Sequence, residues 1–204
     1  MSKIQTNKLQ HTGTGAAEFT LPQTDGSAGQ VLKTDGSGNL SWVTLPTSGL
    51  AMADTWRLTT TYDPGNGSAD FITANWERDD TNGFGQLGTG MTESSGVFTF
   101  PSTGIYQLLF IATYNMDPSG GDTVFAHIHT STDGGSNYTK RTESGVGVGM
   151  GRPATSTTAC LFDVTNTSTH KVKFATGSVA PGSELLGSTT ENKTYVMFTK
   201  VGDT

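Results

Sequence analysis

Residues 96–114 read GVFTFPSTGIYQLLFIATY, and they hold two apolar segments on either side of a short turn. Apolar side chains occupy alternate positions in 97–100, and the run 105–114 follows the same pattern. Successive side chains of a strand point to opposite faces, so this period of two predicts extended chain with one face on a core. Pro101 and Gly104 interrupt the pattern with residues that favour turns. The stretch therefore predicts two consecutive strands.

The same alternation recurs along the rest of the chain. The longest segment without Gly or Pro, residues 154–176, is the one place where a long helix fits easily. There Cys160, Phe162 and Val164 alternate before the polar run 166–169, and alternation then resumes, which predicts a hairpin. Short apolar runs separated by Gly, Asp, Asn and Ser clusters are typical of an all-β antiparallel sandwich or jelly roll.

The N-terminal region has a different organisation, based on an internal repeat. Residues 24–29 read TDGSAG and residues 34–39 read TDGSGN, and Asp-Gly favours the tight turn of a hairpin. Hairpins this small are marginal alone. We therefore expect residues 1–46 to be an extended β appendage that packs against other copies, the alternative being a partly disordered tail. Residues 47–53 are predicted to be a linker, and residues 54–204 the head.

Composition excludes several classes of protein. Only 15% of residues are charged, and 12 basic against 18 acidic side chains give a net charge of −6. Nucleic acid is an unfavourable partner, because phosphate binding needs clustered Lys and Arg. The single cysteine, Cys160, allows neither an intrachain disulfide nor a cysteine zinc site. With no signal-like segment and no apolar run of membrane-spanning length, we expect synthesis in the cytoplasm, no export by a standard signal and no membrane insertion.

Two stretches resemble known families. Residues 96–108 resemble the most recognisable segment of the C1q/TNF-like superfamily, and Trp56, the hairpin around Asn166 and the closing run 195–201 agree with that layout. The resemblance implies a ten-strand C1q/TNF-like jelly roll that assembles as a homotrimer. Leu21-Pro22 followed by residues 25–42 is similar to a module common in bacteriophage tail-fibre and other virion proteins.

Motifs for catalysis are missing from the sequence. Residues 145–151 read GVGVGMG and fail the dinucleotide fingerprint, and no Walker sequence, nucleophile elbow or zincin helix is present. As a strand, this glycine run has one bare face that allows a ring or backbone to come close, the alternative being a flexible loop. Cys160 lies mid-strand, where an inert thiol is expected. We therefore predict a protein that is not an enzyme and needs no cofactor.

Two ion sites remain as hypotheses. His127 and His129 lie two apart on a predicted strand and so share a face, and in a trimer they could form axial rings of imidazoles for a divalent metal or an anion. Asp79, Asp80 and Asn82 supply oxygen ligands in a tight loop suited to calcium, the alternative being a solvated turn.

Together these observations predict a homotrimeric phage fibre or spike on the virion surface. The appendage would bind other virion proteins, and the head would contact a host surface glycan or protein, with many weak contacts adding up to firm attachment. Exposed loop aromatics are the receptor-contact candidates: Tyr62, Trp76, Phe84 and Tyr138. The alternative is a capsid decoration (cement) protein without a receptor, and a polysaccharide-degrading spike is disfavoured because no convincing acid pair is present.

Overall fold

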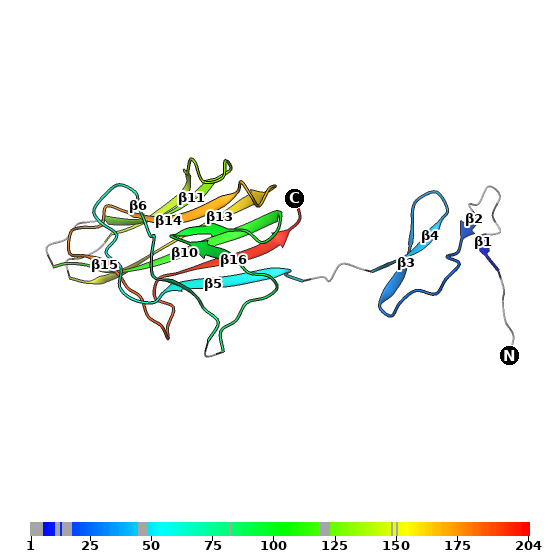
Figure 1. The fold of residues 1–204 in the computed structure, drawn as a ribbon, viewed down its shortest axis with the longest axis horizontal. Helices are drawn as coiled ribbons and strands as arrows, with labels where there is room; N and C mark the ends of the chain where they lie inside the picture. The colour runs from blue at the N-terminus through cyan, green and yellow to red at the C-terminus, as the bar shows by residue number, and fades with distance from the viewer. Residues whose placement is uncertain are drawn as a thin grey trace. The chain divides into compact units, whose positions relative to one another are not determined.

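The computed structural model describes residues 6–10, 13, 18–44, 49–81, 83–118, 123–147, 149 and 151–204. The chain divides into two compact units, residues 1–49 and 50–204. Within the described ranges every regular element is a strand (Figure 1). None of these residues forms a helix long and apolar enough to cross a membrane.

The described part of the first unit contains two small antiparallel pairs. Strand β1 (Lys8–Gln10) pairs with β2 (Glu18–Thr20), and β3 (Gln30–Thr34) pairs with β4 (Leu40–Thr44). The second TDGSGN-type repeat joins β3 to β4 through residues 35–39, a longer loop than the predicted two-residue turn. The Asp35 carboxylate explains this length, because it accepts hydrogen bonds from the amides of Ser37 at 2.8 Å and Asn39 at 3.0 Å.

The head, residues 50–204, is built from two antiparallel sheets that face each other (Figure 1). The first sheet has the strand order β13 (Pro153–Val164), β10 (Gly104–Asn115), β16 (Tyr195–Gly202), β5 (Met52–Leu58), β7 (Trp76–Arg78). The short β15 (Glu184–Leu185) pairs with the end of β10.

The second sheet has the order β12 (Thr139–Gly147), β11 (Thr123–Ser131), β14 (Lys171–Gly177), β9 (Val97–Thr99), β8 (Thr92–Ser94), with β6 (Asp70–Phe71) paired to β14. The two strands predicted within residues 96–114 are β9 and β10, and they lie in opposite sheets. The residues between them therefore carry the chain across the sandwich. The predicted all-β antiparallel jelly-roll sandwich is confirmed.

Aromatic rings fill the space between the sheets around Phe98 of β9. Its ring centroid lies 5.2 Å from that of Phe198, 5.5 Å from Trp76 and Phe174, and 5.6 Å from Trp56. These partners come from β16, β7, β14 and β5, so one side chain contacts both sheets. Edge-to-face and tilted ring pairs of this kind add packing energy beyond the area that they bury.

The first and last strands of the head are neighbours. Strand β5 starts at Met52, two residues before the predicted start of the head, and Met52 is in register with Lys200 of β16. Because the two strands are antiparallel, the head begins and ends at the same end of the sandwich (Figure 1).

Replacement of the central ring tests this description of the core. We expect Phe98→Ala to lower the free energy of unfolding by about 3–5 kcal/mol, because it removes a buried ring and leaves a cavity. Denaturant titration of the full chain measures the change. Phe84→Ala is the matched control, since Phe84 is 44% exposed, and we expect it to cost less than about 1 kcal/mol. Equal losses for the two variants would contradict the assignment.

Candidate functional site

The first sheet of the head has an apolar outward face. On β10, Leu108 and Phe110 point into the core, while Leu109 and Ile111 point away from it and are only partly buried. The register places further outward apolar residues beside them on the adjoining strands. We call this set the apolar face: Ile105, Leu109, Ile111, Ala159, Leu161, Tyr195 and Met197.

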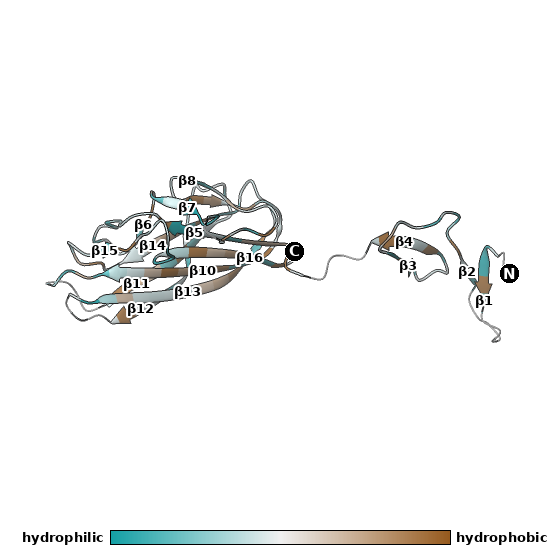
Figure 2. Cartoon of the chain, turned by 90° about the horizontal axis from the view of Figure 1, so that it is seen from below, coloured by the Kyte–Doolittle hydropathy of each residue, from teal (hydrophilic) through white to brown (hydrophobic). Residues whose placement is uncertain are grey.

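Exposure on this face is greatest at Leu161, while the other large apolar side chains of the set are partly buried. Leu161 of β13 is 67% exposed, more than any other large apolar side chain in the described part of the chain. Figure 2 shows brown, apolar stretches along β10. An antiparallel sheet that leaves one face in water normally carries polar residues there, so this face has the composition of a surface that is covered in an assembly.

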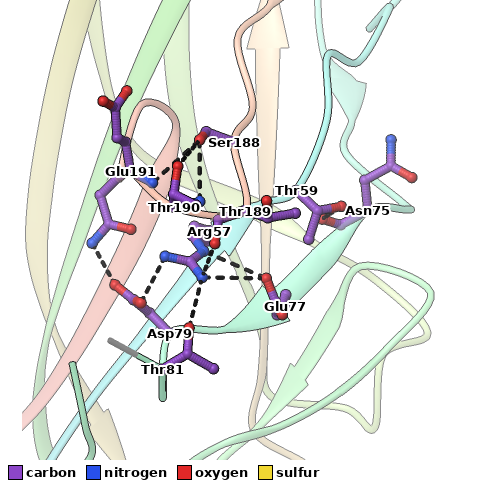
Figure 3. Close-up of polar contacts among 11 residues, drawn as sticks. Arg57, Thr59, Asn75, Glu77, Asp79, Thr81, Ser188, Thr189, Thr190 and Glu191 are labelled. Atoms are coloured by element: carbon purple, nitrogen blue, oxygen red, sulfur yellow. Dashed lines mark hydrogen bonds and ion pairs between the residues drawn. The ribbon is translucent and has the colours of Figure 1, made fainter. Parts of the chain in front are cut away.

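A buried cation borders the apolar face. Arg57 lies on the outward side of β5, in register with Tyr195, and its side chain is only 1% exposed (Figure 3). Its guanidinium pairs with Asp79 at 2.9 Å, approaches Glu77 at 3.4 Å, and donates to the Thr189 carbonyl at 2.6 Å. These contacts hold the segment after β7 and the segment before β16 against the sheet.

Asp79 does not fit the calcium hypothesis. One oxygen of its carboxylate accepts from Arg57 (Figure 3), and the other accepts from the Asn192 amide at 2.7 Å. Asp79 is fully buried while Asp80 is exposed, so the two carboxylates do not converge. Asn82 lies outside the described residues. The expectation of a calcium loop at Asp79 is therefore corrected: its charge neutralises Arg57.

A second buried carboxylate lies on the core side of the same strand. Asp54 accepts hydrogen bonds from the Met91 amide at 2.7 Å, the Trp56 indole at 3.0 Å and Arg78 at 3.1 Å. Arg78 also stacks over the Trp56 ring, with its guanidinium carbon 4.7 Å from the ring centroid. The sequence analysis missed both ion pairs, because their partners lie 22 and 24 residues apart.

Two of the receptor-contact candidates, Trp76 and Phe84, have opposite environments. Trp76 is a correction: its ring packs edge-on against Phe98 in the core, and its indole donates to the Ile72 carbonyl at 3.2 Å. Phe84 is exposed and lies near Arg57, whose guanidinium carbon is 5.9 Å from the ring centroid. Of these two, Phe84 is the one whose ring is exposed for stacking on a ligand.

The other two candidates, Tyr62 and Tyr138, meet at Phe71, a residue that the sequence analysis did not single out. The Tyr62 hydroxyl donates to the Phe71 carbonyl at 3.3 Å, and the Tyr138 ring lies 6.0 Å from the Phe71 ring. Lys173 approaches both Phe71 and Tyr138, with its ammonium about 5 Å from each ring centroid. Both tyrosines are half-buried.

His127 and His129 share a face of β11, as the two-residue spacing predicts, with ring centroids 5.8 Å apart. The axial ion site is nevertheless corrected. The two side chains lie on the outward face of the second sheet, yet they are only 2% and 7% exposed. They are covered within their own chain, so they cannot converge with imidazoles of other copies. Among the described residues, no group of three or more His, Cys, Asp or Glu side chains is placed to hold a metal ion.

Cys160 has a thiol that is poorly suited to nucleophilic attack. It faces the core, where it is half-buried. Burial raises the pKa of the thiol, with a smaller opposing effect from Arg141. Because the thiolate is the reactive form, the thiol is protonated and weakly nucleophilic at neutral pH.

Comparison with solved structures identifies the fold of the head. The chain is similar to the structure of Eiger TNF from S. frugiperda, with a TM-score of 0.57, 12% identity, and coverage of 76% of this chain and 96% of that chain. It is also similar to murine APRIL at pH 8.0, with a TM-score of 0.51, 13% identity, and coverage of 74% and 98%. At such low identity the likeness shows the fold alone, a TNF-like jelly roll. No protein-family model and no curated protein matches the sequence.

The Arg57 network leads to a stability prediction. We expect Asp79→Asn to lower the free energy of unfolding by about 3 kcal/mol or more, because it leaves the Arg57 cation buried without its main partner. Denaturant titration at neutral pH measures the loss. Glu191→Gln is the control, since Glu191 is 70% exposed and 3.7 Å from Lys193, and we expect less than about 1 kcal/mol. A loss as small as that of the control would show that Asp79 does not compensate Arg57.

Proposed function

We propose that this chain is a non-enzymatic structural protein of a bacteriophage particle, and that it forms a homotrimeric fibre or spike through the apolar face. The observation that carries the proposal is the outward face of β10, where Leu109 and Ile111 occupy positions that a solvated sheet gives to polar residues. Covering this face with other copies of the chain removes the apolar side chains from water, which is the dominant favourable term in association.

The proposal that three chains assemble rests on the resemblance of residues 96–108 to C1q/TNF-like proteins. That resemblance implies inner-sheet aliphatic and aromatic residues packed around a threefold axis. The apolar face has this composition, with Tyr195 and Met197 beside the β10 residues. In such an arrangement the Arg57 network lies at the border of the interface and shapes the loops around it.

The N-terminal unit supports attachment to a particle. Four large apolar side chains in the described part of this unit are 37–51% exposed: Leu9, Phe19, Val31 and Leu32. Such residues need partners, and the similarity of residues 25–42 to a tail-fibre module favours other copies and other virion proteins. We place the protein on the virion surface, with no nucleic-acid partner, no membrane insertion and no required cofactor.

The head would then face the host. Three heads on one spike and several spikes on one particle turn weak contacts with a surface glycan or protein into firm attachment. Phe84 is the best-placed contact residue because it is exposed, and Tyr62 and Tyr138 remain candidates as half-buried aromatics. A capsid decoration protein uses the same trimer without a receptor. Cross-linking of intact particles separates the two, since links to tail proteins favour a fibre and links to the major capsid protein favour decoration.

The assembly prediction is tested by light scattering after size exclusion. We expect the full chain to have about three times its 21.4 kDa mass, and residues 50–204 alone to be trimeric as well. Leu109→Glu within residues 50–204 should give a folded monomer, because it buries a charge in the interface. The control is Thr139→Glu, an exposed position on β12, which should leave the trimer intact. A monomeric unsubstituted head would refute the proposed interface.

A further inference from the structure

The outward face of the second sheet holds two buried histidines that have no role in the proposed assembly. On β11, Val124, Ala126 and Ile128 point into the core, so His127 and His129 point out of the sandwich. Outward positions of a two-layer sandwich are normally solvated. Here both imidazoles are more than nine-tenths buried.

Small residues on the neighbouring strands make room for these rings. A Cβ at Gly177 of β14 would lie 2.8 Å from His127 Cε1 and 2.8 Å from the Ser68 carbonyl oxygen. Likewise a Cβ at Gly145 of β12 would lie 2.7 Å from the ring of Phe125. This is the close approach of a ring that the bare glycine face predicts. The His127 ring therefore packs closely against the backbone of the second sheet at Gly177.

The segment around β6 closes this layer at one side. The Phe71 ring lies edge-on to His129 with centroids 5.0 Å apart, and β6 pairs with β14. Two further backbone hydrogen bonds hold the segment down: the Ile72 amide donates to the Phe174 carbonyl, and the Ser178 amide donates to the Gly67 carbonyl, each at 3.0 Å. These bonds are the ones that break if the segment lifts.

The imidazoles lack the partners that a charged histidine needs. Neither ring nitrogen of His129 and not Nδ1 of His127 has a hydrogen-bond partner. Nε2 of His127 lies 3.4 Å from Glu143, which also pairs with Lys140. The charged groups packed around the pair are Lys140, Arg141 and Glu143 from β12, Lys173 from β14, Asp70 from β6, and Asp133 from the β11–β12 loop.

The carboxylates among these groups are already engaged. Asp133 accepts from Ser131 and Asn137, each at 2.7 Å, and Asp70 accepts from the Gly67 amide. Only Glu143 could accept a hydrogen bond from a protonated His127, and none of these carboxylates contacts His129. A positive charge on His129 would therefore lie buried beside Lys140 and Lys173 with nothing to offset it.

We propose that His127 and His129 form an acid-sensitive latch, which holds the segment around β6 against the second sheet at neutral pH and releases it when the imidazoles take up protons. Release lets water reach the rings and relieves the repulsion from Lys140. The rest of the sandwich keeps its contacts, because the core side of β11 carries no titratable group.

The direction of the pH dependence follows from linkage. Burial, together with the neighbouring His127 and Lys140, lowers the pKa of His129 to about 4. Burial also lowers the pKa of His127, with Lys140 acting in the same direction and Glu143 opposing it. The closed state is thus most stable at pH values above about 6.5, the pKa of an exposed histidine. Its stability relative to the open state decreases as pH falls toward 4. For His129 alone, the opening equilibrium rises about twentyfold between pH 7 and pH 5.

Hydrogen exchange on the full chain, followed by NMR in the presence of a chelator, tests the latch. The Ile72 and Ser178 amides are the reporters, and the amides of β10 are the internal reference. We expect the protection factors of the reporters, corrected for the intrinsic pH dependence of exchange, to fall about twentyfold or more from pH 7 to pH 5 while β10 stays protected.

Variants assign the effect to the pair. His129→Phe should abolish most of the acid-induced loss of protection, because it fills the same space without a titrating group. His170→Gln, which replaces the buried histidine of the β13–β14 turn, should leave that loss unchanged. Reporters that stay equally protected at both pH values, or that respond equally in His129→Phe, would overturn the latch. If His129→Phe does not fold, the wild-type imidazole titration decides: a His129 pKa at or above 6.5 would also overturn it.

Discussion

Strand β10 carries apolar side chains on both of its faces, and this constraint organises the molecule. Its inward residues, such as Leu108 and Phe110, are covered by the second sheet of the same chain. Its outward residues, Leu109 and Ile111, have no second layer within the described part of the chain. A strand that is apolar on both faces belongs in the middle layer of three. One chain supplies two layers, and in the proposed homotrimer other copies of the chain supply the third.

Buried ion pairs connect the strands at the edge of the sandwich, whereas aromatic side chains fill its centre. Arg57 and Asp54 lie on opposite faces of β5, and each is paired with a residue at or just after β7. Buried ion pairs are weak evidence for stability, because desolvation offsets much of their attraction. Their directional contacts have a different effect: they fix the segments that follow β7 and precede β16, which border the apolar face.

Much of the fold could be predicted from period-two alternation, because that pattern is local. Residues 154–176 are an example, since Cys160, Phe162 and Val164 indicate a strand and the polar run at 166–169 indicates its turn; β13 and β14 have these positions. The same rule placed His127 and His129 on one face. It could not reveal that they are buried, because their cover includes Phe71, a residue more than fifty positions earlier. Asp79 was misread for the same reason, since its partners Arg57 and Asn192 are distant in sequence.

The pairing of β5 with β16 has a consequence for the connectivity of the head. Met52 and Lys200 are in register on adjacent antiparallel strands, so the two chain ends of the sandwich emerge side by side (Figure 1). A short flexible link could therefore join residue 204 to residue 50 with little strain, and new termini could be opened in a distant loop. The jelly roll is thus topologically suited to circular permutation, and a cargo could be displayed from its far end without changing a strand pairing.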